Sequence, residues 1–558
     1  MSRIIGIDLG TTNSCVAVLD DKGTPKTLAG GDGERTIPSW VAWAPDGRIA
    51  VGQRARRQAV TNPAATIYGT KRLIGRKVNA DDVSWFARLA PFRIVAAPNG
   101  DAWVRVHGQP ISPQEVAAHI LRAIRKTAED ALGEPVTRCV VTVPAYFDDA
   151  QRQATRDAGQ IAGLDVIRIL NEPTAAALAY GAHRVREGRR IIAVFDLGGG
   201  TFDISLMSVE NGIFEVLATG GDTALGGEDW DRRVLERIVD EVFDQHRVDL
   251  TTIPMAMSRL REACETAKKT LSVDRETRVS LPFLANDQHG APINYERTLT
   301  RDYLEQLTKD LLDRLEAPCI RALADAGLSI DAGGAPSIEE VLLVGGMTRW
   351  PAVQDIVERV FKRKPSKGAN PDEVVALGAA AYAGILAGDS DDAQLLDVTP
   401  HDIGIKVGDS GFALVVPRNS MLPVRARRLF ATTSNDQKFV SIELYQGEDK
   451  EVSKMRKLGQ VVLDDLPKGQ AGSVRVELVM TVDVEGILSA TAREIKTGKE
   501  ASVTIRPSGG LSQREIVEII TRRRTESSHV GLLPGGAVRV TTREHMVATP
   551  NLTDDDDS

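Results

Sequence analysis

The sequence predicts an α/β protein of two related lobes, followed by an antiparallel β-sandwich and a short helical remnant. Segments of the first 386 residues recur in the same order, apolar and polar residues alternate from residue 397 to about 507, and helical periodicity then returns. The 558 residues provide about four domain-sized units. We expect lobe I at 1–188, lobe II at 189–386, a linker at 387–397, the sandwich at 398–507, and a short helix with an acidic tail at 508–558.

Three pairs of segments carry the duplication of the lobes. In the first pair, an apolar strand ends in Asp-Leu-Gly and predicts a β-hairpin with a glycine-bearing turn. In the second pair a strand leads into a helix, and in the third an asparagine and a proline precede an alanine-rich helix. One coincidence would be unremarkable, but three in the same order predict related lobes. The pairs are 4–12 with 191–201, 140–163 with 341–362, and 171–180 with 370–382.

The pattern of apolar and polar residues changes after residue 386. A small acidic segment is typical of a solvated linker, and the short alternating runs that follow, such as 439–445 and 474–479, predict an antiparallel β-sandwich. Ser512 followed by Glu515 matches a capping box at the start of one apolar-striped helix, which should end near Arg524. The terminal aspartates are most simply a solvated acidic tail.

Composition excludes several classes of protein. A hydrophobic fraction of 42% and a charged fraction of 26% are ordinary for a globular chain. No apolar run approaches the roughly 18 residues that span a bilayer, and no secretory signal opens the chain, so we expect a cytoplasmic protein without a membrane partner. The net charge of −8 gives no reason to expect nucleic-acid binding. The four cysteines are scattered and predict neither disulfides nor a zinc site, although Cys15 lies beside a candidate phosphate loop.

The two Asp-Leu-Gly turns carry groups that bind polyphosphate. Gly10 lets the backbone approach a phosphate, the hydroxyls of Thr11 and Thr12 can donate to its oxygens, and Asp8 offers a hard oxygen to hydrated Mg²⁺. Either turn alone is typical of a plain hairpin, but both together predict a clamp on the phosphates of a nucleotide. Neither a Walker A pattern nor a strand-linked G-x-G-x-x-G occurs. The second turn offers Asp196, Gly198, Gly199, Gly200, Thr201 and Asp203.

A third glycine segment follows a buried strand at 344–349. Gly345 and Gly346 would let a flat base and ribose lie on the backbone, and the guanidinium of Arg349 could stack on adenine. Without the two hairpins, the same segment would be typical of a strand-to-helix turn with a surface arginine.

These segments resemble the DnaK-type chaperones of the 70-kDa heat-shock family, over residues 3 to about 520. The resemblance implies an actin-like ATPase followed by a peptide-binding sandwich. It further implies an ATP-dependent chaperone that binds extended hydrophobic segments of unfolded or nascent polypeptides, with ATP or ADP, Mg²⁺ and K⁺ as cofactors. A J-domain co-chaperone and a nucleotide exchange factor are the implied partners of a monomer. The matching segments are 5–14, 143–147, 171–177, 196–203 and 344–349.

The resemblance implies catalytic roles for five positions. Lys71 would contact the γ-phosphate and help to position the attacking water. Glu172 and Asp196 would orient Mg²⁺-bound water, Asp8 would hold the hydration shell of the ion, and Asp203 is a candidate for orienting water or for a K⁺ site. Catalysis would consist of positioning and charge neutralisation. The implied phosphate contacts are Gly10, Thr11, Thr12, Asn13, Gly198, Gly199, Gly200 and Thr201.

The resemblance also implies binding residues for adenosine and for peptide. Four residues of one helix would face adenosine, although such spacing alone is typical of a solvated charged face. For any one residue of the peptide cleft, sandwich core is the competing interpretation. The adenosine set is Glu265, Lys268, Lys269 and Ser272, with Gly345, Gly346, Arg349 and Asp372 opposite or nearby; the peptide set is Ile405, Val407, Phe430, Thr433, Val440 and Ile442.

The resemblance further implies a group of residues that communicate between the domains. Pro144 and Arg152 resemble the relay between the nucleotide and peptide domains, and Arg168 and Asp397 match positions that J-domain co-chaperones use. Two features depart from the family. The linker around Leu395 and Leu396 is less apolar, so its docking in the ATP state should be weaker. Only the first lid helix is recognisable, so peptide release should be fast even with ADP bound.

Three other functions remain open at this point. A sugar or metabolite kinase could use the same duplicated fold, but it gives no role to residues 397–507. An actin-like filament protein would polymerise with ATP. An inactive pseudo-chaperone would not need the complete set of Asp8, Lys71, Glu172, Asp196 and Thr201.

Overall fold

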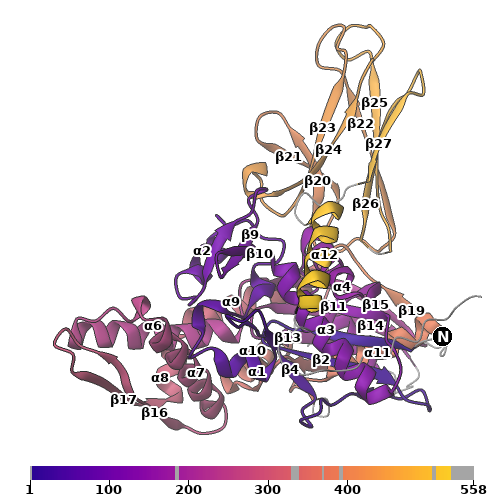
Figure 1. Ribbon diagram of the computed structural model, residues 1–558. Coiled ribbons are helices and arrows are strands. Elements are labelled where there is room, and N and C mark those ends of the chain that lie inside the picture. The colour runs from indigo at the N-terminus through magenta and orange to yellow at the C-terminus, as the bar shows by residue number, and fades with distance from the viewer. Residues whose placement is uncertain are drawn as a thin grey trace, which may run out of the picture.

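The structure is a computed structural model that describes residues 3–181, 188–328, 338–366, 370–388, 394–484, 486–504 and 511–529. Two central sheets with covering helices form the larger part, and two further sheets project from it as a separate layer pair (Figure 1). Among the described residues, no helix is both long enough and apolar enough to cross a membrane.

The first central sheet has the strand order β12-β11-β1-β2-β3, with β4 also paired to β2. The hairpin of β1 and β2 turns at residues 10–12, as the Asp-Leu-Gly pattern predicts. Two long helices cover this sheet, and side chains cap both of them: Ser112 caps α3, and a capping box of Asp148 and Gln151 opens α4. The elements are β1 (Ile4–Leu9), β2 (Asn13–Leu19), β3 (Pro25–Thr27), β4 (Thr36–Pro38), β11 (Arg138–Val143), β12 (Asp165–Asn171), α3 (Pro113–Leu132) and α4 (Asp149–Ala162).

The second central sheet has the order β18-β13-β14-β15-β19. Like β1, strand β13 pairs antiparallel with the next strand of the chain and parallel with a strand from a later segment. The hairpin registers also correspond, because Asp8 lies opposite Cys15 and Asp196 lies opposite Asp203. The repeated segments therefore form equivalent hairpins. The strands are β13 (Arg190–Leu197), β14 (Phe202–Glu210), β15 (Ile213–Asp222), β18 (Ile338–Val344) and β19 (Gln394–Leu396).

The alanine-rich segments of the third repeated pair form helices α5 (Glu172–Gly181) and α11 (Val374–Ala387), which pack against each other. Their approach is so close that a Cβ on Gly378 would lie 1.7 Å from the carbonyl oxygen of Ala175. Small residues therefore bring together the two helices that join the lobes, in a core that also contains residues of both sheets.

Further elements are inserted into both lobes, and the repeats gave no sign of them. In lobe I, two three-stranded sheets are built from β5 (Val41–Trp43), β6 (Ile49–Val51) and β7 (Thr66–Ile67), and from β8 (Arg93–Ala96), β9 (Ala102–Val106) and β10 (Gln109–Ile111), with helices α1 (Gln53–Gln58) and α2 (Asp81–Ala87). In lobe II the insertions are α6 (Gly227–His246), α7 (Pro254–Leu271), β16 (Glu276–Asn286), β17 (Pro292–Thr300), α8 (Arg301–Leu307) and α9 (Lys309–Asp325). Helix α10 (Pro351–Phe361), by contrast, is the helix expected in the second repeated pair.

Residues 403–504 form two four-stranded sheets with the orders β21-β20-β23-β24 and β22-β25-β26-β27. One hydrophobic core contains residues of both sheets, such as Leu444 and Leu478, so the sheets form a sandwich. Apolar and polar residues alternate along each strand, and the apolar side chains on the inner face form this core. The strands are β20 (Ile403–Val407), β21 (Gly411–Val416), β22 (Val424–Ala431), β23 (Val440–Gln446), β24 (Arg456–Leu463), β25 (Arg475–Val482), β26 (Leu488–Glu494) and β27 (Glu500–Thr504).

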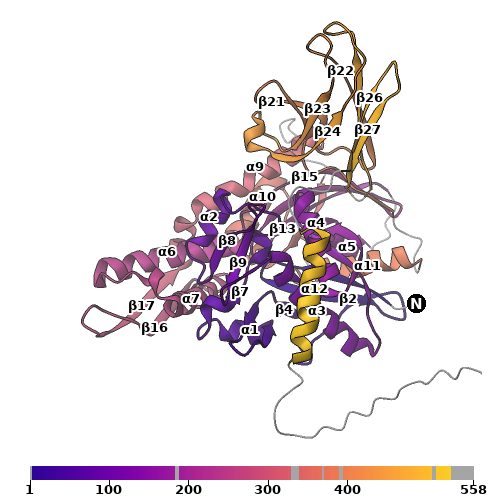
Figure 2. The same ribbon diagram turned by 45° about the horizontal axis from the view of Figure 1, so that its top comes forward.

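Helix α12 (Gln513–His529) is five residues longer than expected, and the predicted capping box is present: the amide of Glu515 donates to Ser512 Oγ and the amide of Ser512 to Glu515 Oε2. The helix lies beside α3 and α4 in both views (Figures 1 and 2). Ile516 and Ile519 are buried in the core of lobe I, and Arg522 binds Glu115 of α3 at 2.7 Å. The expected absence of a longer lid and the acidic tail concern residues 530–558, which lie outside the described residues.

Candidate functional site

A cavity of about 900 Å³ lies between the two central hairpins. Both turns line it, and so do most residues proposed to bind nucleotide. Gly200 and Asp203 lie just behind its wall: a Cβ on Gly200 would lie 2.7 Å from Thr11, and Asp203 is buried on β14. The lining includes Asp8, Gly10, Thr11, Thr12, Asn13, Lys71, Glu172, Asp196, Gly198, Gly199, Thr201, Glu265, Lys268, Lys269, Ser272, Gly345, Gly346, Arg349 and Asp372.

Carboxylates converge at the inner end of this cavity. Lys71 Nζ lies 2.5 Å from Glu172 Oε1 and donates to the carbonyl oxygen of Leu9 at 2.8 Å. Burial, reinforced by the charge of Glu172, raises the pKa of Asp8 to about 7 and that of Asp203 to about 7. The same two causes raise the pKa of Asp196 well above its ordinary value. The site therefore favours ligands that bring positive charge among these side chains.

The donor set fits Mg²⁺ bound to a polyphosphate. Hydrated Mg²⁺ keeps several waters and takes one or two carboxylates together with phosphate oxygens. Within the described ranges, no three acidic, histidine or cysteine side chains are grouped to hold a metal ion directly. Asp8, Glu172 and Asp196 would therefore hold such an ion mainly through its water. Asp203 Oδ2 is buried and lacks a hydrogen-bond partner among the described residues, so it could accept a further cation or a water.

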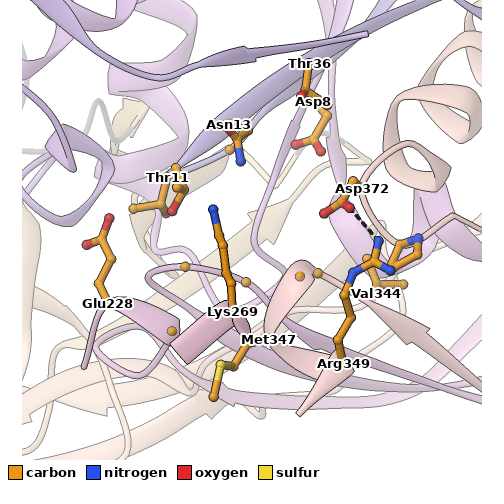
Figure 3. Close-up of a pocket in the computed structure, with 18 of the residues that line it drawn as sticks. Asp8, Thr11, Asn13, Thr36, Glu228, Lys269, Val344, Met347, Arg349 and Asp372 are labelled. Atoms are coloured by element: carbon orange, nitrogen blue, oxygen red, sulfur yellow. Dashed lines mark hydrogen bonds and ion pairs between the residues drawn. The ribbon is translucent and has the colours of Figure 1, made fainter. Parts of the chain in front are cut away.

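The outer end of the cavity is built by α7 and by the turn after β18 (Figure 3). Gly345 has a φ of 82°, and a Cβ there would lie 2.4 Å from the carbonyl oxygen of Leu197, so the flat backbone expected at this turn requires glycine. Arg349 forms an ion pair with Asp372 at 2.6 Å on the side facing Lys269. The cavity therefore lies between the charged side chains of α7 and the glycine backbone that follows β18.

The first four expected adenosine residues lie in α7 or, for Ser272, directly after its last residue, and they differ in what they contact. Lys268 is buried and donates to Asp231 Oδ2 and to the carbonyl oxygen of Gly227, both at 2.8 Å, so it holds the start of α6 as well as lining the cavity. Glu265 contacts Lys269 at 2.6 Å and Arg56 of lobe I at 2.7 Å. Although burial alone would raise it, these two cations hold the pKa of Glu265 below its usual value.

Arg72 is an important residue that the sequence interpretation missed. It is buried, and its Nη2 lies 2.8 Å from Asp229 Oδ2 while its Nε lies 3.1 Å from Glu228 Oε2. It also donates to the carbonyl oxygen of Gly199 at 3.3 Å. Arg72 thus ties lobe I to the second phosphate turn and to the start of α6. Its position next to Lys71 could have indicated a role at the site. Its partners could not be predicted, because they lie far away in the sequence.

Cys15 lies in β2, opposite Asp8, and occupies the place that Asp203 has in the second hairpin. Burial raises the pKa of its thiol far above its usual range, and all four cysteines are buried and free. Cys15 is therefore part of the packing behind the phosphate turn and not a reactive group.

Comparison with protein families matches residues 4–530 of the chain to the Hsp70 protein family. The chain belongs to the Hsp70 family. Hsp70 proteins are chaperones that bind ATP or ADP with Mg²⁺, hydrolyse ATP, and act with unfolded substrates and co-chaperones in protein folding and stress responses.

In this Hsp70, the linker contacts the lobes directly. Strand β19 pairs parallel with β15, and Leu395 packs against the core between the lobes, while Leu396 is half-buried. Asn171 joins the expected relay to the linker: it accepts from Arg152 Nη2 at 2.7 Å and donates to Asp397 Oδ2 at 2.8 Å. The described end of the linker, residues 394–397, is thus docked on the lobes, whereas the strength of that docking stays a prediction.

The other two expected communication residues flank this relay. Pro144 ends the strand that leads to α4, and its carbonyl oxygen accepts from the amide of Phe147 at 3.2 Å. Arg168 Nη2 donates to the carbonyl oxygen of Val484 in the sandwich at 2.8 Å. Arg168 therefore contacts the sandwich directly.

Tyr146 connects the carboxylate Asp203, behind the cavity wall, to the sandwich, and the sequence interpretation did not single it out. Its amide donates to Asp203 Oδ1 at 2.9 Å, and its hydroxyl donates to Glu448 of the sandwich. His401 Nε2 lies 3.1 Å from its carbonyl oxygen. One residue thus contacts Asp203, which lies behind the cavity wall, and also Glu448 and His401 on the side of the sandwich.

The six expected peptide-binding residues lie on β20, β22 and β23 and in the loop after β22. Ile405 and Ile442 are buried in the sandwich core, Phe430 and Val440 pack against that core from half-buried positions, and Val407 and Thr433 are exposed. The set therefore runs from the core to the surface at one end of the sandwich.

Proposed function

We propose that this Hsp70 protein binds extended apolar segments of unfolded polypeptides in its β-sandwich and couples that binding to ATP hydrolysis and nucleotide exchange. The observation that carries the proposal is the cavity between the two hairpins, whose carboxylates and Lys71 surround the place for a triphosphate. The docked linker and the contacts of Tyr146 supply a route from this cavity to the sandwich.

In the proposed reaction, the two turns donate backbone N–H groups and threonine hydroxyls to phosphate oxygens. Lys71 contacts the γ-phosphate and positions the attacking water, while Glu172 and Asp196 orient the water around Mg²⁺ and Asp8 holds its hydration shell. Mg²⁺ supplies charge neutralisation when bound. Asp203, with one unpartnered oxygen, orients water or holds K⁺. Adenosine lies in the slot between α7 and Arg349.

Peptide would lie across the end of β20 and β23. Main-chain hydrogen bonds would provide affinity, and the half-buried Val440 would border a pocket for a Leu- or Ile-like side chain. Phe430, which is half-buried, and Val407, which is exposed, offer further apolar surface at this end of the sandwich.

The remaining proposals concern organisation and partners. Residues 1–188 and 189–386 are the ATPase lobes, 387–397 the linker, and 398–507 the peptide domain. A J-domain co-chaperone would act through Arg168 and Asp397, which lie at the junction of lobe I, linker and sandwich. A nucleotide exchange factor would open the lobes of a monomeric, cytoplasmic protein.

Peptide-stimulated ATPase activity, with and without a J-domain protein, tests the proposed function. Lys71→Ala should abolish turnover because Lys71 is the cation placed against Glu172 at the inner end of the cavity. Lys77→Ala is a matched control, because Lys77 pairs with Asp101 in lobe I and does not line the cavity. Unchanged turnover in Lys71→Ala, or turnover that peptide never stimulates, would contradict the proposal.

A further inference from the structure

We propose that Glu373 is a positioning residue that ties the adenosine end of the cavity to lobe I, so that tight binding of adenosine depends on contact between the lobes. The proposal deepens the nucleotide-binding step of the proposed function and rests on the placement of adenosine given there. Glu373 lines the cavity and immediately precedes α11. Its side chain does not cap that helix, and its carboxylate instead lies between the two lobes.

The carboxylate of Glu373 accepts hydrogen bonds from both lobes. Thr27 Oγ1, at the end of β3, donates to Oε2 at 2.6 Å, and Arg35 Nη1, in the loop between β3 and β4, donates to the same oxygen at 3.2 Å. Asn370 Nδ2 of lobe II donates to Oε1 at 2.6 Å. Although burial opposes it, these three hydrogen bonds lower the pKa of Glu373, so the carboxylate is ionised at neutral pH. One charged group thus joins lobe I to the turn that precedes α11.

Asn370 carries this contact to the adenosine residues. Only the amide nitrogen of its side chain can donate to Glu373, which leaves Oδ1 to accept from Arg349 Nη2 at 3.4 Å. Oδ1 also accepts from the amide of Asp372 at 3.2 Å, and the carboxylate of Asp372 holds Arg349 at 2.6 Å (Figure 3). Glu373 therefore fixes the orientation of the Asn370 amide in which an acceptor, and not a donor, faces the guanidinium.

The turn that begins at Asn370 also supports the backbone after β18, because the amide of Gly345 donates to the carbonyl oxygen of Pro371 at 3.2 Å. Across the cavity, Glu265 of α7 contacts Arg56 of lobe I at 2.7 Å. Each wall of the adenosine end is thus joined to lobe I by one glutamate. Separation of the lobes breaks both contacts, so the adenosine end is complete only when the lobes are closed.

Glu373→Gln in the full chain tests the proposal. Glutamine keeps the size of the side chain, but it removes the charge to which Thr27 and Arg35 donate, and it no longer fixes the Asn370 amide. The dissociation constant of Mg·ADP, measured by titration calorimetry, should rise about tenfold, which is the order of one hydrogen bond to a charged group. The rate of a single turnover of ATP, with protein in excess, should stay within about twofold, because Lys71 at the inner end keeps its contacts.

Three further variants locate the effect. Glu358→Gln is the matched control, because Glu358 is exposed on α10 of lobe II and does not line the cavity, so ADP should bind as in the parent. Thr27→Val removes one donor from lobe I and leaves Glu373 in place, and it should weaken ADP binding about threefold. Glu373 acts through Arg349, so the double variant Arg349→Ala with Glu373→Gln should bind ADP at most about twofold more weakly than Arg349→Ala alone.

A Glu373→Gln protein that binds Mg·ADP like the parent would overturn the proposal, and so would a double variant in which the two losses multiply. If Glu373→Gln does not fold, a Thr27→Val protein with the affinity of the parent overturns it in the same way. A single-turnover rate that falls as far as the affinity also contradicts the proposal, because Glu373 would then hold the whole site. A parent that does not bind Mg·ADP, or an Arg349→Ala protein that binds it normally, would contradict the proposed function itself, on which the inference rests.

Discussion

Binding of Mg·ADP to the nucleotide-free protein should release protons near pH 7. Burial and the charge of Glu172 raise the pKa of Asp8 and of Asp203 to about 7, and that of Asp196 well above its usual value. Part of the carboxyl population is therefore protonated in the empty site. A cation that arrives with the nucleotide stabilises the ionised forms, so these groups lose their protons as it binds.

The size of the effect follows from these values. A group with a pKa of about 7 is about half protonated at pH 7, so Asp8 and Asp203 together should release about one proton per nucleotide, and Asp196 adds to this. At pH 8.5 the first two groups are almost fully ionised, and their release falls to about a tenth of a proton or less. The dependence of the binding heat on the buffer should then lose the contribution of Asp8 and Asp203.

Titration calorimetry in buffers of different ionisation enthalpy measures the number of protons directly. Mg²⁺ is kept in excess so that the nucleotide itself is fully ionised. Asp203→Asn should release about half a proton less than the parent at pH 7. Equal heats in phosphate and Tris buffers at pH 7 would refute the electrostatic description of the site.

Three further outcomes are expected. In the nucleotide-free protein, Asp203→Asn should raise the thermal unfolding temperature much more at pH 8 than at pH 4; the folded pKa lies above the unfolded one, so the stability that the protonated carboxyl contributes is lost as the pH rises from the unfolded value of 3.8 through the folded value of about 7. Arg72→Ala should cost about 3–5 kcal/mol of stability because it leaves Asp229 buried without its cation, and denaturant unfolding that differs little from the parent would contradict this. Ile516→Ala should cost about 2–5 kcal/mol of α12 docking, seen as faster amide exchange in α12 while the sandwich is unchanged.

The sequence was sufficient for the parts of the fold that depend on neighbouring residues. The two hairpins, the helices beginning at Asp149 and Pro351, and the capping box of α12 all follow from local chemistry, and each lies where expected. The alternation of the sandwich strands likewise reflects burial on one face. The helical and hairpin insertions of the lobes lack any counterpart in the repeat, so the repeat could not indicate them.

Contacts between distant segments were beyond such reasoning. Arg72 meets Asp229 because two lobes close around one cavity, and Lys268 meets Asp231 because α6 and α7 pack together within lobe II. Local spacing gives no information about either contact. Tyr146 was part of a matching segment, yet its role as a link depends on Glu448, about 300 residues later. Likewise, tertiary contacts determine that α12 packs on lobe I and not on the sandwich, and the local sequence of the helix does not show this.

The central claim is that the two equivalent hairpins hold the phosphates of one nucleotide from opposite sides. A crystal structure with Mg²⁺ and a bound ATP analogue tests it most directly. We expect the phosphate chain between the turns at residues 10–13 and 198–201, with Asp8 and Asp196 both reaching the ion through its water. A nucleotide bound elsewhere, or held by one turn with the other pointing into solvent, would contradict the claim.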